Sequence, residues 1–295
     1  MEFAIEVDGL RHSYGKRVIY RDLNFKVPRG KVFALLGKNG VGKTTLIKIL
    51  MGFLRPAGGA CRILGDESHN LSPETRRRVG LLFEGHLAYE FMSIESVERF
   101  FASFYPQWQP ELYYGLTDKL GLPGSHKIGN MSEGQRSQVV LGLIMAQQPD
   151  LMILDDYTMG LDAGYRRLFL DYLAEYLAEG DKTVLVTSHI VQDLERFVDE
   201  VIFLEKGGLA TQMPLESFLR GFRQYCLPKD NGVKTPRRGA AIKNVEESRD
   251  EYLLYSFEGP EAVGRCLAEQ GFASQKLEIR PMSFEDAFIG FTGRY

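Results

Sequence analysis

The sequence has few cysteines, and their spacing excludes two kinds of small scaffold. Cys61, Cys226 and Cys266 are odd in number, lie far apart along the 295 residues and form no Cys-x-x-Cys pair. Neither a disulfide framework nor a cysteine-ligated zinc site is expected from this arrangement. We interpret all three as reduced thiols in or near the core.

Long apolar runs are also missing. The longest stretch without a polar side chain runs from Val139 to Ala146, whereas a membrane-spanning helix needs about 20 apolar residues. The segment Met1–Val7 carries acids where a secretory leader has a basic segment followed by an apolar one. The sequence therefore predicts no transmembrane segment and no secretory leader.

Basic residues do not outnumber acidic ones. Lys and Arg number 36 against 39 Asp and Glu, which gives a net charge of -3. This balance argues against a strongly basic nucleic-acid-binding protein, and we expect no nucleic-acid partner. With 44% hydrophobic and 25% charged residues, the composition is typical of a globular protein of about two domains.

The first two thirds of the chain alternate short β-rich runs with longer helical patterns, which predicts an α/β fold on a largely parallel sheet. Apolar runs at Val32–Leu36, Leu151–Leu154 and Thr183–Val186 predict strands covered on both faces. Phe3–Val7 and Val18–Val27 alternate apolar and polar residues and predict an antiparallel, half-exposed layer. Helical periodicity is found at Thr44–Phe53, Ile94–Phe104, Glu133–Gln147, Tyr165–Glu179 and Ile190–Phe197.

The rest of the chain has a different character. Residues 216–243 predict a helix followed by a basic linker, because Lys229–Lys243 is rich in Lys, Arg, Gly and Pro and holds a single acid, Asp230. Residues 244–295 predict a small β-α-β domain, with a strand at Tyr252–Phe257, a helix at Pro260–Gln270 and a strand at Lys276–Ile279.

Two motifs indicate phosphate chemistry. Gly37–Thr44 matches G-x-x-x-x-G-K-[ST] between an apolar run and a helical pattern. Its glycines let backbone N–H groups surround phosphates, Lys43 reaches the β- and γ-phosphates, and Thr44 can ligate Mg²⁺. Leu151–Asp155 is an apolar strand ending in an acid, the Walker B arrangement that places Asp155 near Mg²⁺. The absence of an N-K-x-D motif weighs against a GTPase.

Further motifs follow in a fixed order, and together they resemble the ATP-binding cassette of ABC transporters over residues 1–215. Tyr14 lies where that family has an aromatic ring that stacks on adenine, and Met131–Gln135 stands at the family's signature motif. Gly160–Asp162 resembles the D-loop, and Ser188 with His189 resembles the switch histidine. The resemblance implies a P-loop NTPase fold with a mostly parallel sheet core, an antiparallel β layer and a helical signature subdomain at about 88–148. The C-terminal domain would be a small α+β appendage.

The resemblance also implies roles for residues, with ATP as substrate and Mg²⁺ as cofactor. Catalysis would involve Asp156, His189 and Glu84, and the metal would lie on Thr44, Asp155 and Glu84. The D-loop residue is Asp162, and the signature residues that face a partner's ATP are Ser132, Glu133, Gly134 and Gln135. The nucleotide-binding residues are Tyr14, Gly37, Lys38, Asn39, Gly40, Val41, Gly42, Lys43, Thr44 and Thr45.

Such cassettes act as head-to-tail dimers, in which Ser132 and Gly134 of one chain close on ATP held by Lys43 of the other. The helix N-terminus at the signature presents N–H donors and a positive dipole to the γ-phosphate, and this interaction is lost when that phosphate leaves. Closure and reopening of the dimer would be the power stroke.

Three residues depart from the family pattern near the γ-phosphate. The residue after the Walker B acid is usually Glu, the general base, and here it is Asp156, which is shorter by about 1.5 Å. Glu84 stands where the family carries Gln, and Glu133 replaces the first glycine of the signature. Because a misplacement of about 1 Å can cost about 100-fold, we expect slow hydrolysis. The sequence leaves open an active homodimer or a heterodimer whose partner supplies the complete site.

The class of transporter follows from the end of the chain. Met282–Phe288, followed by Phe291–Gly293, resembles the ending of ATPase subunits of bacterial exporters. The resemblance implies a motor at the cytoplasmic, inner face of the cell membrane, with separate transmembrane permease subunits facing Glu84 and residues 86–93. The alternatives are a soluble ABC protein acting on ribosomes or nucleic acid, and a regulatory nucleotide-gated clamp. The cargo and the direction of transport are not readable from the sequence.

Overall fold

The computed structural model describes residues 2–83, 89–157, 161–178, 180, 182–208, 210–229, 235–272 and 277–293. The chain divides into two compact units, each taken here by itself. The first contains Met1–His189 and Arg196–Gln212, and the second contains Ile190–Glu195 and Met213–Tyr295. None of the described helices is long and apolar enough to cross a membrane. Cys61, Cys226 and Cys266 are all free thiols, as predicted.

An antiparallel sheet forms one layer of the first unit. Its strand order is β2-β1-β4-β5, with bounds β1 Phe3–Tyr14, β2 Arg17–Pro28, β4 Gly58–Ile63 and β5 Asp66–Glu67. Buried and more exposed residues alternate along most of β1 and β2, because successive side chains of a strand point to opposite faces, with adjacent buried pairs at Ala4–Ile5 and Ile19–Tyr20. The predicted antiparallel layer is therefore confirmed.

The central sheet has the order β10-β9-β3-β8-β7-β6. Its strands β3, β6, β7, β8 and β9 are joined by parallel pairing. Every residue of β3, β7 and β8 is buried, as their apolar runs predict. The bounds are β3 Val32–Leu36, β6 Val79–Leu82, β7 Leu151–Leu154, β8 Thr183–Val186, β9 Glu200–Leu204 and β10 Ala210–Pro214.

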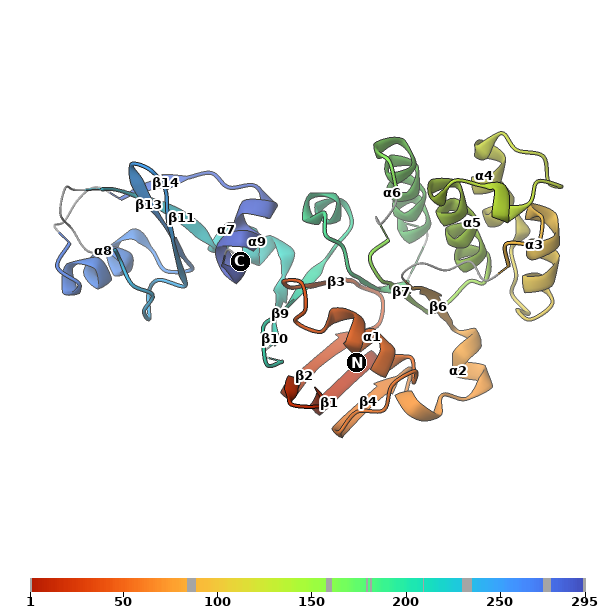
Figure 1. Cartoon of the computed structure of the whole chain (residues 1–295), viewed down its shortest axis with the longest axis horizontal. Coiled ribbons are helices and arrows are strands. Elements are labelled where there is room, and N and C mark those ends of the chain that lie inside the picture. The colour runs from red at the N-terminus through yellow and green to blue at the C-terminus, as the bar shows by residue number, and fades with distance from the viewer. Residues whose placement is uncertain are drawn as a thin grey trace. The chain divides into compact units, whose positions relative to one another are not determined.

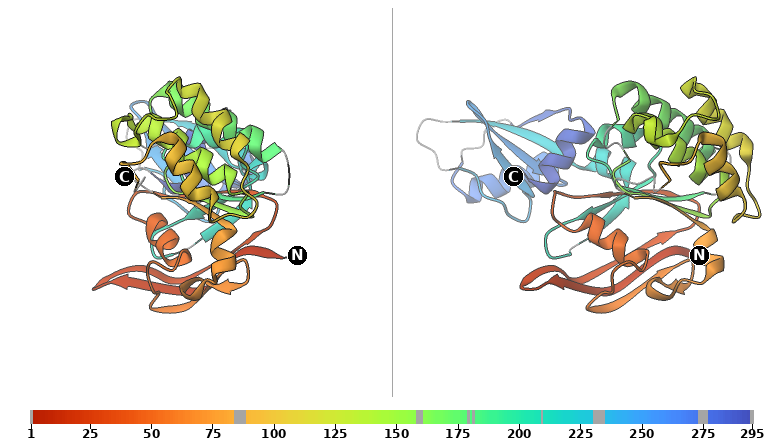
Figure 2. Two further views of the ribbon diagram at one scale, coloured as in Figure 1. Left: turned by 90° about the vertical axis from the view of Figure 1, so that its right-hand side faces the viewer. Right: turned by 45° about the vertical axis from the view of Figure 1, so that its right-hand side comes forward.

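Helices cover the central sheet on both sides. Helix α1 (Lys43–Leu50) lies between the two sheets (Figures 1 and 2), and its residues Leu46, Ile47, Ile49 and Leu50 belong to one buried cluster with residues of both. On the opposite face lie α5 and α6 (Figure 2). A second buried cluster joins α3, α4 and α5, within the predicted helical subdomain. The remaining bounds are α2 Pro73–Arg77, α3 Ile94–Ala102, α4 Pro110–Thr117, α5 Glu133–Ala146 and α6 Ala163–Ala178, with short 3-10 turns at Ser68–Asn70, Asp118–Leu120 and Ile128–Asn130.

The second unit is a four-stranded antiparallel sheet with helices, of order β12-β13-β11-β14. Residues 216–243 predict a helix and then the linker Lys229–Lys243, and the structure places before that linker a strand that was not predicted, β11 (Arg223–Pro228), which pairs with both β13 and β14. Its buried Tyr225 and Leu227 face the core of this unit. The segment predicted as a helix at Ile190–Phe197 forms a 3-10 helix, Val191–Arg196. The other bounds are α7 Leu215–Gly221, β12 Asn244–Glu247, β13 Glu251–Ser256, α8 Pro260–Glu269, β14 Glu278–Arg280 and α9 Phe284–Thr292.

Candidate active site

The glycine-rich loop connects the buried strand β3 to helix α1, as its sequence predicts. Gly42, the last residue before the helix, has φ 118°, a conformation that favours glycine. Lys43 is the first residue of the helix, and its Nζ donates to the carbonyl oxygens of Gly37 at 2.6 Å and Lys38 at 3.3 Å. The ammonium group is therefore held within the loop that would enclose phosphates.

Burial lowers the pKa of Lys43, and the carboxylates of Asp155 and Asp156 partly oppose this shift by favouring the charged form. A cation in a poorly hydrated site interacts strongly with any anion that enters, because less water screens the pair. The loop thus presents both backbone donors and a desolvated positive charge.

Two acids follow strand β7 and are joined to β8 through one hydroxyl group. Asp155 is 2% exposed, and its Oδ1 accepts a hydrogen bond from Thr187 Oγ1 at 2.7 Å. The same oxygen of Thr187 accepts the backbone N–H of Asp156 at 2.8 Å. Thr187, at the carboxyl end of β8, therefore fixes both acids at the carboxyl end of the neighbouring parallel strand β7, where open α/β sheets place ligands.

Asp156 and His189 form an ion pair if the histidine is protonated. His189 Nε2 lies 3.2 Å from Asp156 Oδ2, and the side chain of Asp156 is only 16% exposed whereas that of His189 is 55% exposed. Asp156 also has φ 45°, in the left-handed region where Asp is more readily accommodated than most residues. The carboxylate is thus directed by its backbone, by Thr187 and by His189 together.

These groups line a single cavity of about 290 Å³, near the small end of the range for small-molecule sites. It contains ten of the residues proposed from the sequence, namely Tyr14, Asn39, Gly40, Gly42, Lys43, Thr44, Thr45, Asp155, Asp156 and His189. Gly37, Lys38 and Val41 belong to the same loop but do not line the cavity. Tyr14 is 49% exposed, as a ring that stacks on a planar ligand requires, and His12 packs edge-on against it.

The signature residues lie elsewhere in the unit, at the start of α5. Ser132 caps the helix, since its Oγ accepts from Gln135 N while Gln135 Oε1 accepts from Ser132 N. Ser132 and Glu133 are exposed, and Gly134 is buried. Among the described residues, none of the four signature positions lines the cavity. Ser132 and Glu133 are thus the signature residues that are exposed at the start of α5.

Two further positions remain from the sequence predictions. Asp162 does not line the cavity, and its Oδ1 accepts a hydrogen bond from Tyr165 N at 2.9 Å, near the start of α6. Glu84, proposed as both catalytic and metal-binding, lies outside the described residues.

The donor set suits Mg²⁺. A buried carboxylate, Asp155, and the hydroxyl of Thr44 line the same cavity as the phosphate-binding loop. Mg²⁺ prefers oxygen ligands and usually takes only one or two from the protein, with substrate phosphates and water completing the octahedron. No larger cluster of His, Cys, Asp or Glu with metal-binding geometry occurs in the described parts of the chain.

Three lining residues, Arg17, Ile19 and Thr187, were not predicted from the sequence. Thr187 reaches the two acids because β8 pairs with β7, and the sequence does not show this pairing. Its position just before Ser188 and His189 could have indicated that it belongs to the site. Arg17 follows Tyr14 by three residues, and its Nη2 donates to the carbonyl oxygen of Gly40 at 2.9 Å.

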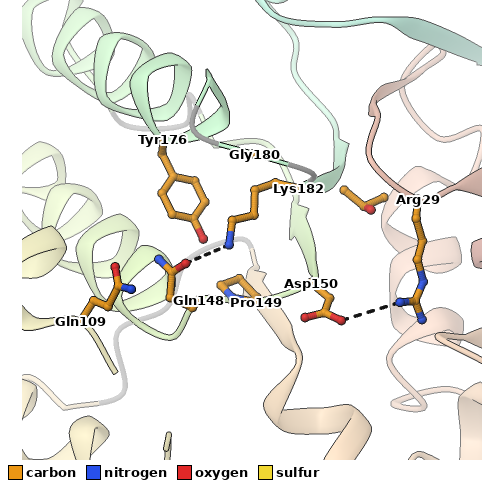
Figure 3. A pocket seen from close by; sticks show the side chains of 9 residues that line it. Arg29, Gln109, Gln148, Pro149, Asp150, Tyr176, Gly180 and Lys182 are labelled. Atoms are coloured by element: carbon orange, nitrogen blue, oxygen red, sulfur yellow. Dashed lines mark hydrogen bonds and ion pairs between the residues drawn. The ribbon is translucent and has the colours of Figure 1, made fainter. Parts of the chain in front are cut away.

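A second cavity, of about 450 Å³, lies beside the start of β7 and β8 and is a poor candidate for a site (Figure 3). Its polar groups already bind one another. Lys182 Nζ donates to Gln148 Oε1 at 2.9 Å, Arg78 donates twice to Asp150 Oδ2, and Arg29 lies 3.9 Å from the same oxygen. This arrangement is typical of a structural ion-pair network.

Comparison with known proteins extends the similarity over both units. Residues 20–159 match a protein-family model described as ABC transporter. Nod factor export ATP-binding protein I of Cupriavidus pinatubonensis (strain JMP 134 / LMG 1197) is 31% identical over 308 residues, which cover 98% of this chain and 91% of that protein. The protein of that name from Burkholderia orbicola (strain AU 1054) is 28% identical, with 98% and 97% covered. A solved ATP-binding subunit of an ABC transporter, 28% identical, matches 74% of this chain and 92% of its own, with a TM-score of 0.65.

Proposed function

The chain belongs to the ATP-binding subunits of ABC transporters, and from this premise we propose that it is the MgATP-hydrolysing motor of an exporter. The observation that carries the proposal is the single cavity that combines Lys43, Thr44, Asp155, Asp156 and His189. Export is the process named for the relatives that match along nearly the whole chain. The motor would be peripheral, at the cytoplasmic face of the membrane that holds its permease.

ATP would bind with its adenine on Tyr14 and its phosphates on the loop at residues 37–45. The backbone N–H groups and the Lys43 ammonium group would stabilise the negative charge of the β- and γ-phosphates. Mg²⁺ held by Thr44 and Asp155 would neutralise part of the charge that develops on the phosphates.

Asp156 is the proposed general base. Its carboxylate accepts the proton of the attacking water, and His189, 3.2 Å from Oδ2, holds the carboxylate in one orientation. Asp reaches about 1.5 Å less far than the usual Glu, so the water must come closer to the protein backbone. The proposed consequence is slow turnover rather than none.

Steady-state ATPase measurements on the purified chain test this assignment. We expect a low but measurable rate that Asp156→Asn lowers by about 100-fold or more, since Asn cannot accept the proton. Thermal unfolding of both proteins in parallel controls for loss of fold. Rates at background for the wild type and for Asp156→Asn alike would contradict autonomous hydrolysis and favour a heterodimer with a second ATPase.

An exposed aromatic surface on the helical subdomain supports a membrane-protein partner. Phe91, Phe100 and Phe104 are 71%, 36% and 53% exposed. Phe100 packs against Phe104 with ring centroids 5.1 Å apart and against Tyr89 at 5.2 Å. Phe91 lies two residues from Tyr89 in the sequence, and exposed apolar surface of this kind marks a contact with another protein. We assign it to the cytoplasmic surface of the permease.

Co-purification distinguishes the export motor from a soluble ABC protein that acts on ribosomes or nucleic acid. The proposal predicts recovery with a polytopic membrane protein, and loss of that partner after Phe91→Ser combined with Phe104→Ser. Ile279→Ser, at a side chain 53% exposed in the second unit, is the matched control. Salt-sensitive recovery with nucleic acid instead would contradict the export assignment.

A further inference from the structure

Strand β2 of the antiparallel layer supplies a buried hydroxyl group to the phosphate-binding loop. Tyr20 is 1% exposed, and its Oη donates a hydrogen bond to the carbonyl oxygen of Gly42. Gly42 is tightly enclosed there, because a Cβ atom added to it would lie 2.6 Å from Tyr20 Oη and 2.6 Å from Ile19 Cγ2. The loop is thus packed directly onto this strand.

The hydrogen bond controls the direction of a peptide group at the site. Gly42 O also accepts Leu46 N at 2.8 Å, the first hydrogen bond of α1. In a planar trans peptide the N–H of the next residue points opposite to the carbonyl group. Two donors on Gly42 O therefore fix the N–H of Lys43 toward the open N-terminal end of the helix, where phosphates would bind.

Tyr20 is itself held firmly in place. Arg21 N donates to Gly207 O at 3.0 Å, and Tyr20 and Gly207 form an isolated parallel bridge. A Cβ atom at Gly208 would lie 3.0 Å from the Tyr20 Cα atom. Burial raises the pKa of Tyr20 far above its ordinary value, with a smaller contribution from Tyr14, so the phenol remains a donor.

We propose that Tyr20 is a positioning residue for nucleotide binding, which fixes the Gly42–Lys43 peptide toward the phosphates of ATP. Tyr20 stands on the strand that follows the turn after Tyr14, and Arg17 on the same strand donates to Gly40 O. One β-hairpin thereby carries the adenine-stacking ring and holds two carbonyl groups of the phosphate-binding loop. This inference rests on the proposed MgATP site.

Tyr20→Phe isolates the hydroxyl group, because the ring and its packing stay. Tyr113→Phe is the matched control, since Tyr113 is also fully buried in the first unit and its Oη donates to the carbonyl oxygen of Ile94 at 2.9 Å. Affinities are measured for MgATP and, by displacement of MgATP, for Mg-tripolyphosphate, which has phosphates but no adenine. Wild-type binding of MgATP tests the premise separately, before any variant is compared.

The expected result is a loss of about five- to tenfold in affinity for both ligands in Tyr20→Phe, as one lost hydrogen bond gives. Tyr113→Phe should keep both affinities within about twofold, even where its melting temperature falls equally. Two results would overturn the proposal in a protein that binds MgATP. One is affinity of Tyr20→Phe within about twofold of wild type for both ligands, and the other is a loss for MgATP alone.

Discussion

At the scale of single residues, the site depends on the hydroxyl group of Thr187, which lines the cavity and contacts both acids. Thr187 Oγ1 donates to Asp155 and accepts from the N–H of Asp156 while only 1% of Thr187 is exposed. A buried group that loses a hydrogen-bond partner retains part of the cost of its desolvation. Thr187 thus links the stability of the sheet edge to the geometry of both acids.

Replacing Thr187 by Val keeps the shape and removes these two hydrogen bonds. We expect the free energy of unfolding to fall by about 1–3 kcal/mol and the ATPase rate to fall with it, since the carboxylate of Asp156 is no longer fixed. Denaturant titration and steady-state turnover measure the two effects. Thr187→Ser retains the hydroxyl group and should recover most of both; equal losses in Ser and Val would point to packing of the methyl group instead.

The residues themselves predict site features where they are contiguous, and the family resemblance adds the distant Tyr14 and His189. The loop at 37–44 and the pair Asp155 and Asp156 each lie within one short segment, so their spacing alone carries the chemistry. Thr187, Arg17 and Tyr20 reach the site because β8 neighbours β7 and because the β1–β2 hairpin packs on the loop. Such neighbours are set by sheet order, which no local pattern encodes.

At the scale of elements, short helices depend on their caps. Helix α2 has five residues, and Ser72 caps it by accepting from Thr75 N at 3.2 Å. Asp66, at the end of the antiparallel layer, accepts from both Ser72 N and Ser72 Oγ, at 3.0 and 2.6 Å. These hydrogen bonds from Ser72 lower the pKa of Asp66 to about 2.

The sign of the resulting pH dependence follows from the direction of that shift. A carboxyl group whose pKa is lower in the folded than in the unfolded protein stabilises the fold above its ordinary pKa of 3.8, and the contribution is lost as the pH falls toward 2. The melting temperature of wild type should therefore exceed that of Asp66→Asn near neutral pH. The difference should shrink on acidification, and a constant difference would contradict the assignment.

The second unit contains strands that the local sequence pattern does not predict. The order β13, α8, β14 follows the predicted β-α-β alternation, whereas β12 and β11 were not predicted, and β11 lies directly before the segment that predicts a linker. Its six residues end at Pro228, directly before a stretch of glycines and basic residues. A short strand next to strong linker signals has too little local pattern to be separated from them, and only pairing with β13 and β14 defines it.

At the scale of the whole molecule, the proposed head-to-tail dimer would bring the exposed signature residues of one chain to the ATP held by another. Ser132 and Glu133 are exposed at the N-terminus of α5, and Glu133 carries a negative charge where the family has glycine. A carboxylate near the γ-phosphate opposes closure, whereas the helix dipole favours it. We expect a weak ATP-dependent homodimer, with the heterodimer as the alternative.

Sedimentation velocity of Asp156→Asn, which should bind ATP without hydrolysing it if Asp156 is the base, tests this assembly. The sedimenting mass should double with MgATP, whereas the protein should stay monomeric with MgADP. The reason is that the γ-phosphate is the ligand that both chains of the proposed dimer share. Adding Glu133→Gly should strengthen the dimer, while Glu175→Gly, a loss of one acid on α6 away from the signature, should not. A monomer under all conditions would favour the heterodimer.

The central claim is that the cavity around Lys43 binds MgATP, and calorimetric titration of the purified chain tests it most directly. Wild type should bind MgATP, and Lys43→Ala should bind it about 100-fold more weakly or not at all, with little change in melting temperature, because the lost ammonium group serves the phosphates and not the core. Equal affinity of the two proteins for MgATP, or no binding by the folded wild type, would contradict the account.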